Sequence, residues 1–445
     1  MARWLEGVRS PVAKSDEEAG SVRHPVQNAS AVARTSGRFK SGIFTTTAAN
    51  LAGVIASGTT GILITRSLEP ASRGQYAAIT AWFAVTLVLG ELGQTAATTY
   101  FVAKDRTNAR QYVATSRNLM IGSGLVTLLA GLLASPYLAA GNPSVQAGFK
   151  LMFATCIVSY IAASFTFSLQ AVNTTRWNLV RLSQPVAFST LIWSLNALHH
   201  LTLLNCIRSV SITVVMQCVL AYWLCRKDGL TGGRADRPTT KTMAHYGFHQ
   251  LAGAVPAILV SRLDQLALSI SVNPVELGHY AAATALTSLA LPAITAVGSV
   301  IFPKIALQRE LDFEGARATR RKAISATIAI SSIAAIMIAA GAYWIVPLLF
   351  GAAYSPAVPL VWVLAPGVAL MGCSQVCSDV LRGYGVPLAV AKAQWMAAGL
   401  AIALLILLLP RYGVVGAAIS TVAAASVGLA FVMFKIGRLD GNEVE

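Results

Sequence analysis

The chain has 445 residues, of which 55% are hydrophobic and 12% are charged, and its mean hydropathy is +0.62. A soluble domain carries about 25% charged residues, so this chain has too little polar material to cover a surface that faces water. The composition excludes an ordinary soluble enzyme and predicts a polytopic membrane protein. We interpret the net charge of +16 as charge sorted across a bilayer, and no nucleic-acid partner is expected.

The chain begins with a polar, basic segment, residues 1–40, which lacks the apolar stretch of a cleavable signal. Its composition predicts a disordered cytoplasmic tail. Twelve apolar stretches follow, each roughly 20 residues long, which suits a hydrocarbon core of about 30 Å. The predicted fold class is therefore an all-α membrane protein with twelve transmembrane helices. The predicted spans are 43–65, 76–102, 118–139, 148–171, 183–199, 203–225, 247–272, 279–303, 323–349, 357–381, 388–409 and 413–435.

The distribution of positive charge predicts the orientation of these spans. With the amino terminus placed in the cytoplasm, 28 of the 34 Lys and Arg residues fall in segments on the cytoplasmic side. Cytoplasmic loops of membrane proteins are enriched in Lys and Arg, so this bias supports the predicted spans and their orientation. We expect a multi-pass protein of the inner (plasma) membrane with both termini in the cytoplasm.

A short segment occurs twice. Six of the eight residues of Gly74–Ala81 are identical in Gly278–Ala285, which begins 204 residues later. Six predicted spans separate the copies, so both enter the membrane in the same direction, as in a parallel repeat. The repeat predicts two six-helix lobes with a binding site between them near the midplane. The expected boundaries are 41–225 for the first lobe, 226–246 for a cytoplasmic connecting loop, 247–436 for the second lobe and 437–445 for a cytoplasmic tail.

Small residues recur at intervals of four in the first span, at Gly53, Ser57 and Gly61. Such rows let helices approach closely in membranes. We interpret this row as a helix-packing surface.

The sequence contains no Walker A, HExxH or GxSxG pattern and no CxxC pair. It therefore predicts neither an enzyme nor a bound cofactor or metal. The informative residues are charges inside apolar spans, because an ionised group in the bilayer core costs at least about 2.5 kcal/mol. They are Arg262 and Asp264 of the seventh span and Glu91 of the second.

Arg262 has two interpretations. It is either a cation that holds an anionic substrate group in a wet cavity or half of a structural ion pair with another helix. Asp264 lies about 200° further around the same helix, so one of the two is expected to face the cavity and the other a neighbouring helix. Glu91 is a candidate partner of Arg262, a proton acceptor during transport, or part of a polar network. Asp264 and Glu91 are thus the candidates for ion coupling or structural pairing.

Two further arginines flank the loop between the first two spans. Arg66 ends the first span and Arg73 precedes the second, both on the predicted outer side. They are either anchors whose charged ends reach the interface or residues of the substrate cavity.

Four segments of the sequence resemble Wzx-type polysaccharide flippases of the multidrug/oligosaccharidyl-lipid/polysaccharide (MOP) exporter superfamily. They are Ile64–Tyr76, Ser261–Gln265 and Val275–Tyr280, with Phe302-Pro303-Lys304 further on. The similarity runs over about residues 41–436.

The resemblance implies a V-shaped pair of six-helix lobes around a cavity that opens alternately to each side. It implies transport of a lipid-linked (undecaprenyl-diphosphate) oligosaccharide from the inner to the outer leaflet, with membrane lipids, glycosyltransferases or a glycan polymerase as partners. Cations that suit a diphosphate often line this cavity, a role that Arg262 matches and for which Arg66 and Arg73 are outer candidates. The alternative is a cation-coupled multidrug antiporter, although the first span lacks the acidic residue usual in that group. A multi-span glycosyltransferase ranks lower because the predicted outer loops are short.

Overall fold

Nearly every residue of the described part of the chain is helical. The computed structural model describes residues 52–441 apart from 293, 295–297, 299–300, 302–304 and 306–312. Within these residues no strand occurs, and the predicted all-α fold class is confirmed. The predicted tail 1–40 lies outside the described residues.

The helices follow the predicted spans in chain order. A helix over 52–67 corresponds to the first span, and α2 and α3 together correspond to the second. The bounds are α2 Pro70–Gly90, α3 Gln94–Lys104, α4 Ala109–Leu138, α5 Pro143–Val172, α6 Thr174–Ala197, α7 Leu203–Lys227, α8 Arg237–Ser271, α9 Pro274–Ser288, α11 Phe313–Phe350, the 3-10 helix η2 Ala352–Ala357, α12 Val358–Gly383 and α13 Pro387–Gly441.

Seven helices of the described part are long and apolar enough to cross a membrane, or eight if α2 and α3 are one bent span. The number is below twelve partly because α13 contains the last two predicted spans as one element. Its backbone is not helical at Gly413, the first residue of the predicted span 413–435, where φ is 53°. The chain is therefore a multi-pass membrane protein.

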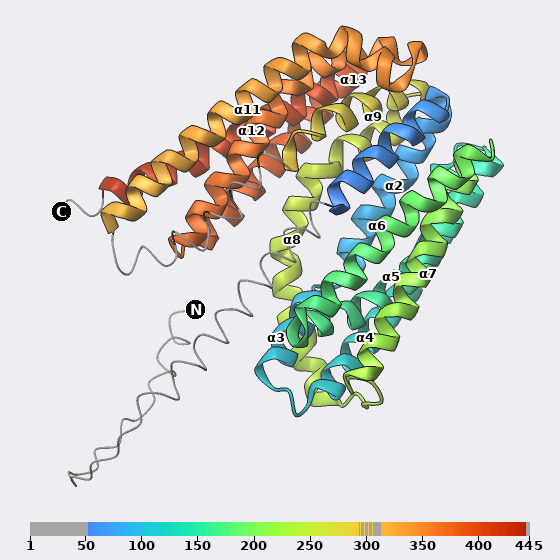
Figure 1. Ribbon diagram of the computed structural model, residues 1–445, viewed down its shortest axis with the longest axis vertical. Coiled ribbons are helices and arrows are strands. Elements are labelled where there is room, and N and C mark those ends of the chain that lie inside the picture. The colour runs from blue at the N-terminus through green and yellow to red at the C-terminus, as the bar shows by residue number, and fades with distance from the viewer. Residues whose placement is uncertain are drawn as a thin grey trace. The chain divides into compact units, whose positions relative to one another are not determined.

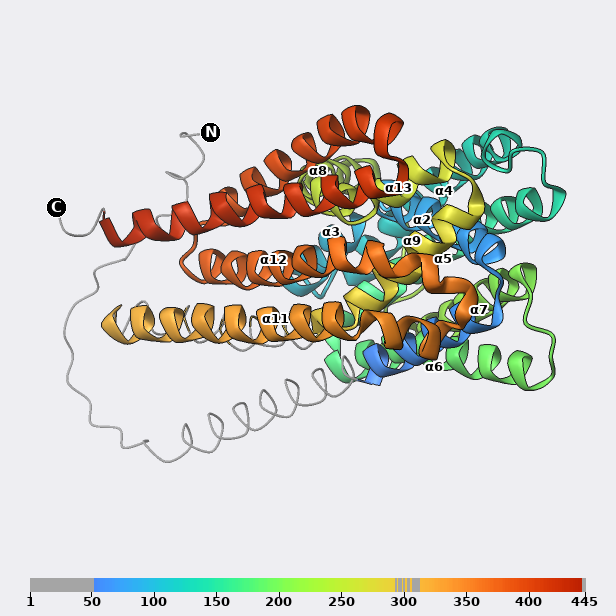
Figure 2. The same ribbon diagram turned by 90° about the horizontal axis from the view of Figure 1, so that it is seen from above.

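Two bundles of helices are joined through α2 and α9. Helices α4 to α7 pack together, and α11 to α13 form a second group whose members lie side by side in Figures 1 and 2. Helix α2 contacts α5 and α7 of the first bundle, whereas α9 contacts α11 and α12 of the second. The two helices also pack against each other, and the repeated alanines Ala77, Ala78, Ala281 and Ala282 are buried there. The repeat thus supplies one of the contacts at which the bundles meet.

The second span is broken between α2 and α3, which are bent by 42°. Leu92 and Gly93 have φ values of 51° and 66°, in the left-handed region that favours glycine. A Cβ atom on Gly93 would also overlap the carbonyl oxygen of Gly247 in α8. The Ser123 hydroxyl donates to the Gly90 carbonyl at 2.6 Å, which satisfies a backbone group next to the break.

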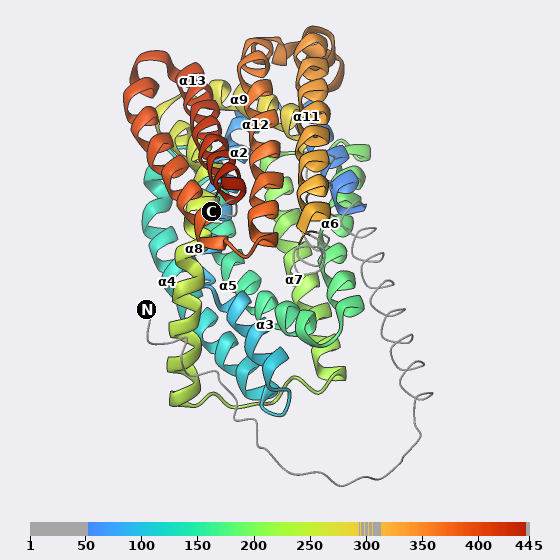
Figure 3. The same cartoon turned by 90° about the vertical axis from the view of Figure 1, so that its left-hand side faces the viewer.

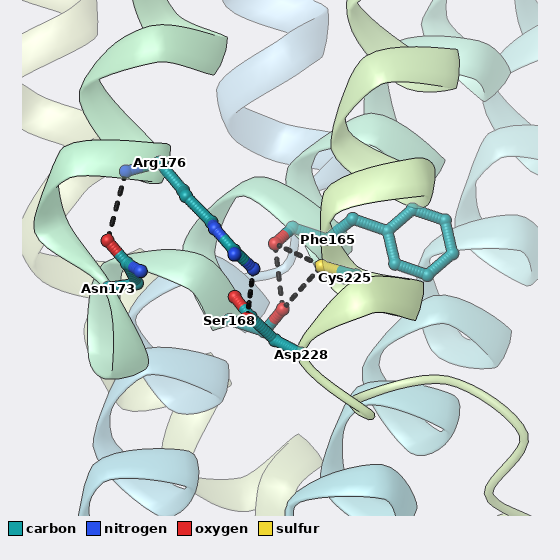
Figure 4. A network of polar contacts seen from close by, with 6 residues as sticks. All are labelled: Phe165, Ser168, Asn173, Arg176, Cys225 and Asp228. Carbon is teal, nitrogen blue, oxygen red and sulfur yellow. Dashed lines mark hydrogen bonds and ion pairs between the residues drawn. The ribbon is translucent and has the colours of Figure 1, made fainter.

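A polar network fixes the end of α7 to the turn between α5 and α6 (Figure 4). Arg176 forms an ion pair with Asp228, and the Asn173 side chain accepts from the Arg176 amide at 3.1 Å, capping α6. Ser168 and Cys225 are 3.3 Å apart between Oγ and Sγ. These contacts therefore hold the end of α7, after which the chain leaves the first bundle, against the start of α6.

The connection between the bundles is short and bound to α4. It spans only 228–236, within the predicted loop 226–246, because α8 begins at Arg237 on an Asp236 cap. Gln111 of α4 donates to the Asp236 carboxylate at 2.5 Å, and Arg110 donates to the Gly229 carbonyl at 2.6 Å. Hydrogen bonds from Thr239 and Gln111 lower the pKa of Asp236. Figure 3 shows α8 rising from the ends of α3 and α4 toward α13.

Candidate functional site

A polar cavity of about 590 Å³ lies among α2, α8, α9, α12 and α13, a volume that suits a small-molecule site. Each helix except α13 lines it with residues three and four apart, such as Ser261, Arg262 and Gln265 of α8. This spacing places side chains on one face of a helix. The uncharged polar residues of the lining are Tyr76, Thr80, Ser261, Gln265, Thr284, Thr287, Ser288 and Thr421.

Arg262 is one of the charged residues of this cavity. It lies nine residues before the end of α8 at Ser271, or about 13 Å along the helix. Its Nη1 donates to Oε1 of Gln265 at 3.3 Å. No carboxylate of the described residues lies within 4.0 Å of its guanidinium, so the interpretation as a structural ion pair finds no partner among them.

Arg73 lines the same cavity from α2. Its Nε donates to the Thr65 hydroxyl at 2.9 Å, and its guanidinium carbon lies 5.7 Å from the centroid of the Tyr76 ring. Both contacts hold the guanidinium without neutralising its charge. The fold thus brings together two arginines that are 189 positions apart in the sequence.

Asp264 also lines the cavity, but neighbouring helices hold its carboxylate. Its Oδ2 accepts from the Tyr280 hydroxyl of α9 at 2.5 Å and from the Thr421 hydroxyl of α13 at 3.4 Å, and its side chain is 7% exposed. The sequence predicted that one of Arg262 and Asp264 would face the cavity. Both reach it, and only Asp264 is bound to other helices. With all three groups ionised, Arg73, Arg262 and Asp264 give the cavity a formal charge of +1.

Arg66 and Glu91 lie away from this cavity, since neither belongs to its lining. Arg66 is exposed, and its Nη1 donates to the Leu348 carbonyl at 3.1 Å. Glu91 is the C-cap of α2 at the break. It lies about 27 Å from Arg73 along the axis of this helix. No carboxylate pairs with Arg262 in the described part of the chain, so of the three alternatives for Glu91 the pair with Arg262 is absent from it.

A second cavity of about 660 Å³ adjoins the first. Ala285 and Ser288 of α9 line both. The helix over 52–67 lines the second cavity with its row of small residues, and a Cβ atom on Gly61 would meet nothing within 4 Å. The interpretation of that row as a packing surface is therefore wrong for Gly61, because its face is open. The other members of the lining are mostly apolar, with Arg181 and Gln184 of α6 as exceptions.

The sequence interpretation missed the uncharged polar residues of the polar cavity. Thr80 follows Arg73 by seven residues, and Thr284 and Ser288 are four apart in α9. Polar residues in phase with an intramembrane arginine were the available signal. No set of three or more His, Cys, Asp or Glu side chains that could hold a metal occurs among the described residues.

Solved transporter structures share this fold. An inward-closed structure of the lipid II flippase MurJ is 14% identical, with a TM-score of 0.74 over 88% of this chain and 87% of that one. An inward-facing multidrug resistance MATE transporter of the MOP superfamily is also 14% identical, with a TM-score of 0.70 over 87% of this chain and 96% of that one. The chain therefore has the fold of MOP superfamily transporters.

The sequence comparisons give one curated relative and one family. An uncharacterized membrane protein of Methanocaldococcus jannaschii is 24% identical over 195 residues, which are 42% of this chain. The match spans only 37% of that relative's length. Residues 39–308 match the family described as "Polysaccharide biosynthesis protein". Since the match covers more than half of the 445 residues, this chain belongs to the polysaccharide biosynthesis protein family.

Proposed function

We propose that this protein is a flippase for surface polysaccharide biosynthesis. It moves a lipid-linked (undecaprenyl-diphosphate) oligosaccharide from the inner to the outer leaflet by alternating access. The observation that carries the proposal is that Arg73 and Arg262 line one polar cavity and have no carboxylate within 4.0 Å among the described residues. Guanidinium groups bind phosphate oxygens through paired hydrogen bonds, which suits a diphosphate.

The two adjoining cavities support an amphiphilic substrate. The polar cavity offers hydroxyls and two cations, and the second cavity is lined mostly by glycines and apolar residues. Because Ser288 lines both, a molecule at this position reaches a charged site and an apolar one together. A lipid diphosphate has these two parts.

Asp264 is the proposed ion-coupling residue, and Glu91 is the second candidate. Asp264 holds Tyr280 and Thr421 through one carboxylate oxygen, so a change in its protonation would alter contacts with two helices. Glu91 lies at the broken part of the second span, where discontinuous helices of other transporters bind ions.

The orientation and the lobe boundaries belong to the same proposal. Both termini lie in the cytoplasm, the membrane is the inner (plasma) membrane, and the lobes comprise 41–225 and 247–436. Glycosyltransferases or a glycan polymerase act on either side of the transport step. Reporter fusions at Glu445 and after Ala140 test the topology, because they should report opposite sides.

The direct test compares Arg262→Ala, Arg73→Ala and the control Arg208→Ala in a deletion strain. Arg208 is exposed on α7 and bonds only to Asn205 among the described residues. Loss of a hydrogen bond to a charged group costs about 1.5–3 kcal/mol, or roughly tenfold to hundredfold in affinity. The cavity variants should insert normally, lose surface glycan and accumulate the lipid-linked precursor on the inner leaflet. Normal surface glycan in both cavity variants would refute the proposal.

A cation-coupled multidrug antiporter is the second candidate, favoured by the buried carboxylate of Asp264 and the MATE-like fold. Drug susceptibility of the deletion strain separates the two. Changed susceptibility with normal surface glycan would favour the antiporter. Loss of glycan with unchanged susceptibility supports the flippase.

A further inference from the structure

Helices α2 and α9 cross at equivalent positions of the sequence repeat. Each begins with proline, at Pro70 and Pro274, and has glycine four residues later, at Gly74 and Gly278. The prolines are 204 residues apart, as are the glycines. The repeated unit thus begins four residues before the eight-residue segment found in the sequence.

The contact between these residues is reciprocal. A Cβ atom on Gly74 would overlap the carbonyl oxygen of Pro274 and lie 2.8 Å from the Gly278 amide nitrogen. A Cβ atom on Gly278 would overlap the carbonyl oxygen of Pro70 and lie 3.1 Å from its Cα atom. Each glycine therefore touches the first carbonyl of the other helix, which is the symmetry of a two-fold contact within one chain. Any side chain at either position forces the backbones apart.

The crossing lies next to the polar cavity. Arg73 precedes Gly74, and Ala77 and Ala281, three residues beyond the glycines, both line the cavity. Further contacts surround the crossing: the Tyr354 hydroxyl donates to the Leu68 carbonyl at 2.7 Å, and His279 Nε2 lies 3.2 Å from the Ala353 carbonyl oxygen. The starts of α2 and α9 and the turn at η2 thus meet at one end of the cavity.

We propose that the Gly74–Gly278 crossing is the gate that closes this end of the cavity, the outer end in the predicted orientation. The proposal rests on the proposed transport function. Two helix starts that meet through backbone alone can close fully, and they can separate without withdrawing interlocked side chains. Because α2 contacts the first bundle and α9 the second, separation of the bundles at this end opens the gate.

The experiment measures access to the cavity, and it needs no substrate. A Thr284→Cys reporter is labelled with a membrane-impermeant maleimide in intact cells and in inside-out vesicles, so both faces are tested. Protein without the reporter gives the background from the six native cysteines. The variants Gly278→Val and Gly278→Ala, and their counterparts at Gly74, force the helices apart. Gly122→Val and Gly399→Val are matched controls, since a Cβ atom at either site meets nothing within 4 Å.

The gate predicts faster labelling from the face next to the crossing in all four variants and unchanged labelling in both controls. Forced overlap in packed protein shifts a two-state equilibrium by about tenfold, and labelling should rise accordingly. If the valine variants fail to insert, the alanine variants decide, because one Cβ atom already overlaps a carbonyl. Labelling no faster than in the Gly122→Val control overturns the gate, even where glycan export is intact. If labelling is faster and the deletion strain shows no glycan defect, the gate is upheld and the proposed substrate is refuted.

Discussion

The two copies of the repeat, at the start of α2 and of α9, have the same scaffold and opposite chemistry. Tyr76 and Tyr280 occupy equivalent positions, yet Tyr76 lies against the guanidinium of Arg73 and Tyr280 donates to the carboxylate of Asp264. The residue equivalent to Arg73 is Leu277, which is 2% exposed in the apolar core. The duplication kept the residues that pack the helices together, and the charges differ. One charged site between two similar halves is the result.

Exchanging side chains between the copies should give the largest effect. Leu277→Arg would place an unpaired charge in a tightly packed apolar cluster, and we expect a loss of more than about 3 kcal/mol of stability and failure to accumulate. Arg73→Leu should accumulate normally, because Arg73 is half-buried at a cavity. Membrane abundance and thermal stability in detergent measure both. Equal tolerance of the two changes would show that the copies are not chemically distinct.

Filling the junction of the two cavities should come next. Ser288→Trp would occupy space in both cavities, so export should fall by about tenfold or more while the protein still inserts. Ser288→Ala keeps the space and removes only the hydroxyl, and a small loss is expected. The ratio of surface glycan to accumulated precursor measures the difference. Similar losses of export in both variants would show that the Ser288 hydroxyl matters and that the space at the junction does not.

Removing one hydroxyl from each copy compares the two tyrosines directly. Tyr280→Phe takes a hydrogen bond from the buried Asp264 carboxylate and should cost about 1–3 kcal/mol of stability. Tyr76→Phe keeps the ring that lies against Arg73 and should cost less than about 0.5 kcal/mol. Thermal unfolding of the purified proteins measures both. A larger loss for Tyr76→Phe would reverse the comparison.

The smallest effect is expected for Arg66→Ala. Arg66 is exposed and donates to a backbone carbonyl outside the cavity, so its loss should cost within about 0.5 kcal/mol and leave export near the parent level. Export assays of the single variants of Arg66 and Arg73 decide whether the functional site ends at the lining of the polar cavity. A defect in Arg66→Ala as severe as that in Arg73→Ala would extend the site outward.

The hydropathy of the sequence predicted the helices well because each span must satisfy its backbone hydrogen bonds internally. The repeat at Gly74 and Gly278 also predicted a duplicated scaffold. The sequence could not show that the two copies touch each other, because that contact joins residues 204 positions apart. It also gave Arg66 and Arg73 equal standing, since both flank one loop. Only the direction in which each side chain leaves its helix separates them, and small differences of phase at helix ends determine that direction.

Helix α8 has a mechanical consequence. Its first residues are tied to α4 through Asp236 and Gln111, and its last turns contact α13 and carry Arg262 and Asp264. A continuous helix has a nearly fixed length. Because α8 is attached at both ends, rotation of one bundle against the other must bend it. Pro256 lies in its interior and lacks the amide that would close the ladder there, which makes this turn the most compliant. The angle at Pro256 therefore links the position of the short connection between the bundles to the position of the charged groups in the cavity.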